Sequence, residues 1–217
     1  MLKFIETLKN IWTIDELKNR ILITLFFLVI YRLAAQVVLP GVDYNIISDA
    51  QIAGGGGLLG LLNAFTGGAF ANASVVALGI MPYISASIVV QLMGVALPYL
   101  QKLQKEGESG RKKITQITRW LTIAICVVQA PAYLYGLGAL GVPDSAFVLG
   151  KGPFFIIPSV IILVTGCIFA MWLGEKITDR GIGNGISLLI TVGIIASLPL
   201  SFTQEVISQL SGSGGLI

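Results

Sequence analysis

The chain has 217 residues, of which 55% are apolar and only 12% charged, and its formal net charge is +3. Soluble domains carry roughly 25% charged residues, so this composition excludes an ordinary water-soluble domain and indicates a lipid environment. The absence of histidine removes the commonest metal ligand, and Cys126 and Cys167 lie in apolar segments that predict buried thiols, so we expect neither a metal nor a cofactor.

The chain begins with two different helical patterns. In residues 1–12, Leu2, Ile5, Leu8 and Trp12 recur at helical spacing between polar residues, which predicts an amphipathic helix. Such a helix lies on a membrane surface or packs on other protein, and the pattern favours neither. Residues 13–40 contain a long apolar run that ends at Pro40, and they predict the first membrane span.

A short apolar segment follows between clusters of glycine. Residues 54–68 hold the sequence Leu58–Phe65, which is about two helical turns and too short to cross a bilayer. Its backbone groups would be unsatisfied in lipid. We therefore expect a half-helix buried among the spans or lying in a polar cavity.

Four more apolar runs predict further spans at residues 74–98, 114–140, 153–174 and 182–202. Polar loops are expected at residues 99–113 and 175–181, and an external tail or loop at 203–217. Pro82 lies within the second of the five spans, where it should bend the helix. The expected fold class is an all-α, polytopic transmembrane helix bundle.

The basic residues predict the orientation of these spans. Twelve lysines and arginines fall before the apolar run 21–39 of the first span, or between the apolar runs of the second and third and of the fourth and fifth spans, whereas the alternate loops hold only Lys151. Because cytoplasmic loops are enriched in lysine and arginine, the amino terminus is expected in the cytoplasm. Arg32 is the one ionisable residue deep in a span, and snorkelling or pairing with a neighbouring helix is favoured over a direct functional role.

Two spans each contain a pair of isoleucines four residues apart, a spacing that by itself indicates no particular function. Ile80 and Ile84 in the second span, and Ile186 and Ile190 in the fifth, are four residues apart and so share a helix face. The second span also holds Ser85, Ser87 and Gln91 at membrane depth, where small and hydroxylated residues usually serve helix packing.

Motifs for catalysis are missing from the sequence. The glycine-rich stretch 181–185 resembles a nucleotide-binding loop only faintly, and it follows a membrane helix rather than a strand, so we reject that interpretation. Neither an acid pair nor a nucleophile with a base is found, which argues against an enzyme. The polar stretch 103–113 predicts either a solvated loop or a docking surface for a cytosolic partner.

Three longer motifs carry a resemblance to a known family. These are ALGIMPYISASI at 77–88, KEGESGRKK at 105–113 and WLGEKITDRGIGNGIS at 172–187. They closely resemble the bacterial SecY family, whose members are channel subunits of the Sec protein translocase. The family has ten spans in two inverted halves, so the resemblance implies that this chain is the first half of such a channel.

The resemblance also implies a role for each feature. Ile80, Ile84, Ile186 and Ile190 match part of a hydrophobic pore ring, and Ser85, Ser87 and Gln91 match one wall of a lateral gate. The residues that match the plug sealing the pore are Leu58, Leu59, Leu61, Leu62, Asn63 and Phe65. The residues that match a cytoplasmic docking surface are Lys105, Glu106, Arg111, Lys112 and Lys113.

The implied setting is the bacterial cell inner membrane. The implied partners are the SecE and SecG subunits, the SecA motor or the ribosome or both, signal peptides and nascent polypeptides, the C-terminal half of the channel, and membrane lipids. Direct readout of nucleic acid is not expected.

Two rival interpretations remain open. One is half of a secondary transporter with a discontinuous helix, a class that normally places ionisable residues near the midplane. The other is a non-conducting membrane assembly subunit.

Overall fold

The computed structural model describes residues 14–43, 46, 63, 66–137, 142–147, 150 and 152–210. Within these ranges the elements are helices, and the only pairing between extended segments consists of the isolated bridges Val38–Ser74 and Val42–Phe147. The helices are α2 (Asp15–Gln36), α5 (Met81–Ala96), α6 (Pro98–Lys105), α7 (Glu108–Gly136), a 3-10 turn (Asp144–Ala146), α8 (Pro153–Arg180) and α9 (Gly185–Leu210). The all-α fold class is therefore confirmed. The predicted interfacial helix 1–12, most of the predicted half-helix 54–68 and the end of the chain after Leu210 lie outside the described residues.

The second predicted span begins later than expected. Residues 75–80 form turns, and α5 starts only at Met81, whereas the sequence predicts a helix from residue 74. Pro82 lies in the first turn of α5, where its missing N–H costs nothing. The expectation that Pro82 bends the helix in mid-span is wrong, because the helix starts there instead. Gly79, with a φ of 56°, belongs to the turns before it.

The predicted polar loop 99–113 is also wrong, because most of it is helical. α5 and α6 meet at Leu97 with a bend of 100°, and α6 and α7 are separated only by the turn Glu106–Gly107. Gly107 has a φ of 69°, which glycine adopts readily. Leu100 and Leu103 are buried in this corner, and a Cβ on Gly110 would overlap the Leu103 carbonyl oxygen, so glycine permits the close crossing of α6 and α7.

The last two helices are longer than the sequence predicts. α8 continues through the expected loop 175–181 as far as Arg180, and α9 continues past residue 202 to Leu210. Polar residues alone did not end α8, because Ile177 remains completely buried and keeps the last turns packed. The connection between the two helices is reduced to residues 181–184.

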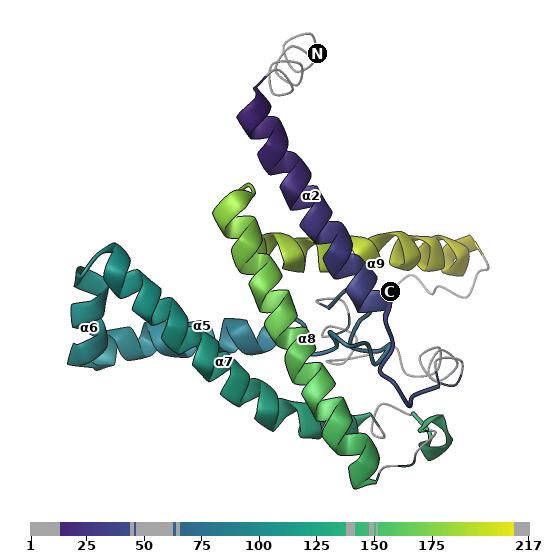
Figure 1. Ribbon diagram of the computed structural model, residues 1–217. Coiled ribbons are helices and arrows are strands. Elements are labelled where there is room, and N and C mark those ends of the chain that lie inside the picture. Colours follow the sequence, from purple (N-terminus) through teal and green to yellow (C-terminus); the bar gives the residue numbers. More distant parts are fainter. Residues whose placement is uncertain are drawn as a thin grey trace.

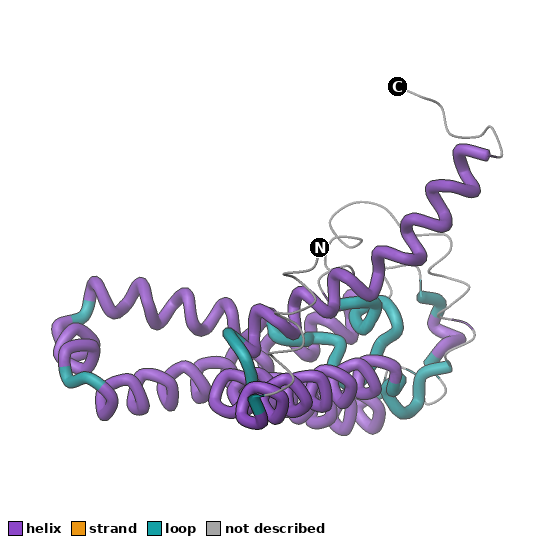
Figure 2. The backbone as a smooth tube through the Cα atoms, turned by 90° about the horizontal axis from the view of Figure 1, so that it is seen from above, coloured by secondary structure: helices purple, strands orange, loops and turns teal. Residues whose placement is uncertain are grey.

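α8 is the central helix of the described structure. It packs against α2, α7 and α9, and its buried positions include Leu163, Cys167, Ala170 and Leu173. Figure 1 shows α8 between α7 and α2, with α9 running across α2 and α8 rather than alongside them. Figure 2 shows α5, α6 and α7 forming an arm that extends away from the place where α8 and α9 meet.

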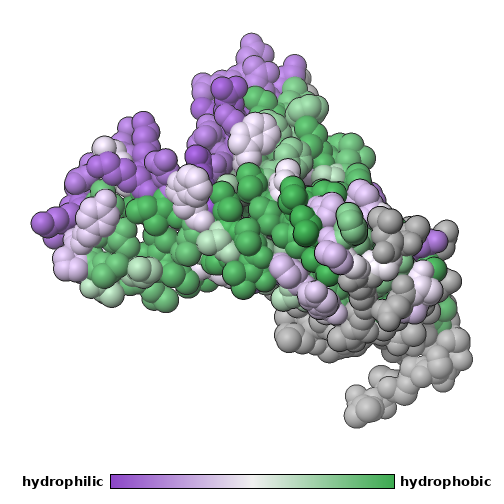
Figure 3. All heavy atoms as spheres, turned by 60° about the horizontal axis from the view of Figure 1, so that its bottom comes forward, coloured by the Kyte–Doolittle hydropathy of each residue, from purple (hydrophilic) through white to green (hydrophobic). Residues whose placement is uncertain are grey.

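Two described helices, α7 and α8, are long and apolar enough to cross a membrane, and the bent pair α5–α6 makes a third if it counts as one span. The apolar part of α9, Gly185–Ala196, is shorter. The structure thus supports two or three membrane-length helices where the sequence predicts five. Figure 3 shows a broad hydrophobic surface with hydrophilic residues gathered along one edge, as expected for a protein that meets both lipid and water.

Candidate functional site

A small cavity lies where α2, α5 and α9 meet the segment before α5, residues 66–80. Its volume is about 80 Å³, and its lining is almost entirely apolar. It is lined by Tyr31, Thr66, Ile80, Met81, Ile84 and Ile190. The structure therefore brings three of the four predicted pore isoleucines to one cavity, although they come from parts of the chain more than 100 residues apart.

The fourth isoleucine, Ile186, packs close to this cavity without lining it. It belongs to the same hydrophobic cluster as Ile80, Ile84 and Leu189. A Cβ on Gly174 would lie 2.9 Å from Ile186 Cγ1, so glycine in α8 leaves the room that Ile186 occupies. Because Ile186 precedes Ile190 by one helical turn, α9 presents the two side chains at different heights.

Local hydrogen bonds explain why α9 starts where it does. The Asn184 side chain accepts hydrogen bonds from the backbone N–H groups of Ile186 at 3.1 Å and Ser187 at 3.3 Å. Asparagine is a preferred N-cap because its side chain satisfies such otherwise unpaired groups. The Gly185 N–H donates to Thr178 Oγ1 at 2.9 Å. Stretch 181–185 thus turns the chain and caps α9, a role that its glycine-rich pattern did not predict.

The predicted gate residues lie along α5. Ser85 and Gln91 are exposed and Ser87 is half-buried. Gln91 Nε2 donates a hydrogen bond to Ser87 Oγ at 3.1 Å, so two of the three polar side chains satisfy each other within the helix. The apolar residues Ile88 and Leu92 beside them are exposed as well. This face of α5 therefore combines polar and apolar side chains without a covering helix in the described part of the chain.

Of the predicted plug residues, only Asn63 lies within the described structure; Leu58, Leu59, Leu61, Leu62 and Phe65 lie outside it. The Asn63 carbonyl accepts hydrogen bonds from the Gly68 N–H at 3.0 Å and from Thr66 Oγ1 at 3.2 Å. Its side-chain oxygen accepts another from the Ala71 N–H at 3.0 Å. Asn63 is thus tied to the segment that leads into the cavity.

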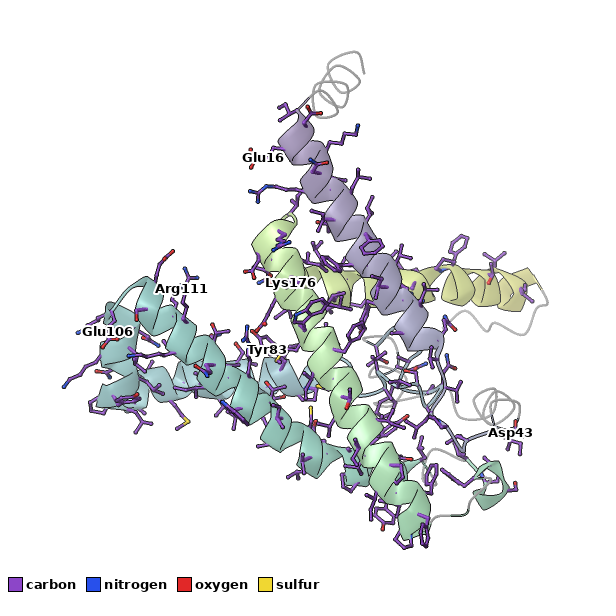
Figure 4. The ribbon with its side chains drawn as sticks, viewed as in Figure 1. Glu16, Asp43, Tyr83, Glu106, Arg111 and Lys176 are labelled. Carbon is purple, nitrogen blue, oxygen red and sulfur yellow. The ribbon has the colours of Figure 1, made fainter. Side chains whose placement is uncertain are left out.

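The predicted docking residues surround the corner between α6 and α7, and all of them are exposed: Lys105, Glu106, Arg111, Lys112 and Lys113. Lys113 Nζ lies 3.7 Å from Glu106 Oε2 across the corner. In Figure 4, Glu106 and Arg111 lie at the outer end of the arm, while Glu16 and Lys176 lie at the ends of α2 and α8 on the same side of the molecule. Asp43 lies at the opposite side.

Two long-range contacts were not predicted from the sequence. Arg32 Nη1 donates to the Gly67 carbonyl at 3.0 Å, and Tyr133 Oη donates to the Phe70 carbonyl at 2.6 Å. Both bonds hold the segment before α5 onto a helix. Among the described residues, acidic, cysteine and histidine side chains form no group that could hold a metal ion.

Comparison with known proteins identifies relatives of the chain. The SecY family profile matches residues 74–216. Protein translocase subunit SecY of Haemophilus influenzae is 44% identical over 191 residues, which is 88% of the chain and 43% of that protein. The SecY subunit of Pseudomonas aeruginosa is 44% identical over 199 residues, which is 92% of the chain and 44% of that protein. The chain therefore spans less than half the length of these curated relatives.

Solved structures agree with this likeness at the level of the fold. Sec61 in a canine ribosome–channel complex from the endoplasmic reticulum matches with a TM-score of 0.64 at 19% identity, over 90% of the chain and 42% of that protein. A second structure, described as that of a protein conducting channel, matches with the same values. At this identity the similarity concerns the fold alone.

Proposed function

The chain belongs to the SecY family, and from this premise we propose that it forms part of the wall of a protein-conducting channel in the bacterial plasma membrane. Its substrates are unfolded polypeptides that cross the membrane and transmembrane segments that leave the channel sideways into lipid. The role is that of a passive conduit, and the chain catalyses no chemical reaction.

The observation that carries this proposal is the convergence of Ile80, Ile84 and Ile190 on one apolar cavity. A channel for polypeptides must admit side chains of every chemistry, so it cannot bind them through fixed polar groups. A constriction of branched apolar side chains fits loosely around a moving chain and restricts ions by dewetting when it is empty. Ile186, in the same cluster, completes this chain's share of the ring.

The polar and apolar face of α5 supports a second part of the proposal. Ser85, Ser87 and Gln91 form one wall of a lateral gate, where a signal peptide leaves the pore. Polar groups at membrane depth need a protein or water partner. When the gate opens along this face, these side chains therefore give up their present partners and contact the passing segment instead. The gate then balances the partition of that segment into lipid against the interactions that hold the two walls of the gate together.

Closure and docking complete the proposal. The segment Leu58–Phe65 acts as a plug that seals the pore from outside, and its described residue Asn63 accepts a hydrogen bond from the Ala71 N–H in the segment before α5. The exposed corner of α6 and α7 docks the SecA motor or a ribosome.

The charged ends of α2, α7 and α8 gather on one side of the molecule (Figure 4), which supports a cytoplasmic amino terminus. SecE, SecG and the C-terminal half of the channel are the expected membrane partners.

Ion leak through the resting channel tests the ring. We expect Ile84→Ser and Ile190→Ser to raise the conductance of proteoliposomes that hold the complete channel, because a hydroxyl group lets water wet the constriction. Ile195→Ser is the matched control, since Ile195 is exposed on the same helix and does not line the cavity. Unchanged conductance in both ring variants would refute the assignment.

A further inference from the structure

α2 is linked to α9 at two places, through the turn before α9 and through Gly67, and Ile186 and Ile190 lie between these places along the chain. We propose that α2 fixes the height and rotation of α9 through Thr24 and Arg32, which makes these two side chains positioning residues for the pore ring. The inference rests on the proposed function, because it assigns a task to residues that do not themselves line the pore constriction.

The first contact joins Thr24 to the turn before α9. Thr24 Oγ1 donates to the Arg20 carbonyl at 2.8 Å within α2 and accepts a hydrogen bond from the Ile182 N–H at 3.1 Å. Thr24 is only 8% exposed. Because its proton is committed to its own helix, the hydroxyl oxygen can only face Ile182 as an acceptor. This arrangement sets the position of the turn on α2.

Glycine makes that contact close. A Cβ on Gly181 would overlap Thr24 Oγ1, and a Cβ on Gly185 would overlap the Gly174 carbonyl oxygen of α8. The Gly185 N–H is held by Thr178 of α8. The glycines of stretch 181–185 therefore let the start of α9 lie directly against both α2 and α8, where larger residues would hold it away.

The second contact lies farther along α9. Arg32 Nη1 donates to the Gly67 carbonyl at 3.0 Å, and a Cβ on Gly67 would lie 2.8 Å from the Gly193 carbonyl oxygen of α9. Gly67, with a φ of 62°, is thus held between the Arg32 side chain and the α9 backbone. Here α2 reaches α9 through one intervening residue.

The spacing of the two contacts defines the geometry of α9. Thr24 and Arg32 are eight residues apart on α2, which corresponds to about 12 Å along the helix. Along the chain the contacts fall at Ile182, three residues before α9 begins, and at Gly193 within α9, so Ile186 and Ile190 lie between them. A rigid helix held at two points can neither slide nor rotate freely. This arrangement also assigns a task to Arg32, whose charge is otherwise costly inside a membrane span.

The test measures resting ion leak in proteoliposomes that hold the complete channel. Thr24→Val keeps the side-chain shape but removes the acceptor oxygen. We expect the leak to rise about fivefold, the change that the loss of one hydrogen bond produces in a two-state equilibrium. Thr24→Ser should restore the resting leak. Thr165→Val is the matched control, because the Thr165 hydroxyl bonds only the Ile161 carbonyl of its own helix.

Further variants keep the test decisive. Gly181→Ala should reproduce the leak of Thr24→Val from the other side of the contact, and it serves if Thr24→Val fails to assemble. Arg32→Met should also raise the leak, and Arg32→Lys, which keeps a donor, should raise it less. Adding Thr24→Val to Ile190→Ser should change the leak little, because the ring is already open.

The outcomes separate this inference from the proposed function. If Ile190→Ser raises the leak and neither Thr24→Val nor Gly181→Ala does, α2 does not position α9 and the inference is overturned. A full fivefold rise on top of Ile190→Ser would also overturn it, because Thr24 would then act away from the ring. If Ile190→Ser itself leaves the leak unchanged, the pore ring assignment has failed instead.

Discussion

The inner junction, formed by residues 66–80 with α2, α8 and the start of α9, differs sharply from the outer part of the arm, residues 88–120, which is called the arm from here on. In the inner junction Leu173, Ile177 and Leu189 are completely buried. In the arm Leu92, Val95, Tyr99 and Trp120 are each at least 65% exposed. Residues 88–100 of the arm are as apolar in sequence as the inner junction, so apolar composition alone does not say whether a helix packs within the chain.

The difference follows from how closely the backbones approach. The inner junction uses glycine at positions 67, 166, 174, 181 and 185, where a Cβ would meet a neighbouring segment. The arm uses such glycines only near its corner, at Gly94 and Gly110. Small residues are how membrane helices pack tightly without a hydrophobic driving force. The inner junction is therefore built for fixed geometry, whereas the exposed side chains of the arm suit contact with lipid or with other subunits.

The largest expected effect tests close packing in the inner junction. A Cβ on Gly166 would overlap the Val75 carbonyl oxygen. We expect Gly166→Val to lower the free energy of unfolding by about 3 kcal/mol, because a backbone carbonyl cannot move aside as a side chain can. Thermal unfolding of the complete channel in detergent measures this. Gly136→Ala, where a Cβ meets nothing within 4 Å, should stay within about 0.5 kcal/mol of the parent. Equal effects of the two variants would remove the contrast.

A smaller and more local effect is expected in the arm. Gly110→Ala should separate α6 from α7 at their corner and lower stability there by about 2 kcal/mol, since its Cβ would overlap the Leu103 carbonyl oxygen. Limited proteolysis of residues 98–113 should become faster. Resting ion leak should stay unchanged, because the corner does not contact the cavity. A leak as large as that of Ile190→Ser would show that arm and inner junction are coupled.

The smallest effect concerns the ion pair that joins the two regions. Arg119 donates from Nε and Nη2 to the Glu175 carboxylate at 2.9 and 2.6 Å. Since the Arg119 side chain is 49% exposed, we expect Glu175→Gln to lower the unfolding free energy by only about 1 kcal/mol. Glu106→Gln, which breaks the longer and more exposed pair with Lys113, is the matched control and should change it by less than about 0.5 kcal/mol. A larger effect of Glu106→Gln would contradict this order.

Local sequence patterns predicted the fold class and the helices whose apolar runs are long. The runs within 121–136 and 153–174 are helical, and the four-residue spacing of the isoleucines puts each pair on one helix face. The role of these isoleucines in a pore stays a prediction. The structure adds that residues from α5 and α9 line the same cavity. This depends on how the helices pack against one another, which helical periodicity cannot predict.

Where the structure differs from the sequence-based predictions, the cause is again tertiary packing that local patterns do not show. Polar composition suggested a loop at 99–113, but burial of Leu100 and Leu103 keeps that stretch helical and Gly107 confines the break to one turn. Pro82 signals the start of a helix as readily as a bend, and only the turns before it decide between the two. The contacts of Thr24 with Ile182 and of Arg32 with Gly67 join residues 158 and 35 positions apart, so no local window reveals them.

The most direct test of the central claim is capture of a translocating polypeptide. A photocrosslinker is placed at Ile84, at Ser87 or at Ile190, and a polypeptide is arrested in the complete channel. Val128, which is 74% exposed on α7, serves as the control position. We expect strong adducts to the arrested polypeptide from the three test positions and none above background from Val128. Adducts from Val128 alone, or from no position at all, would contradict it.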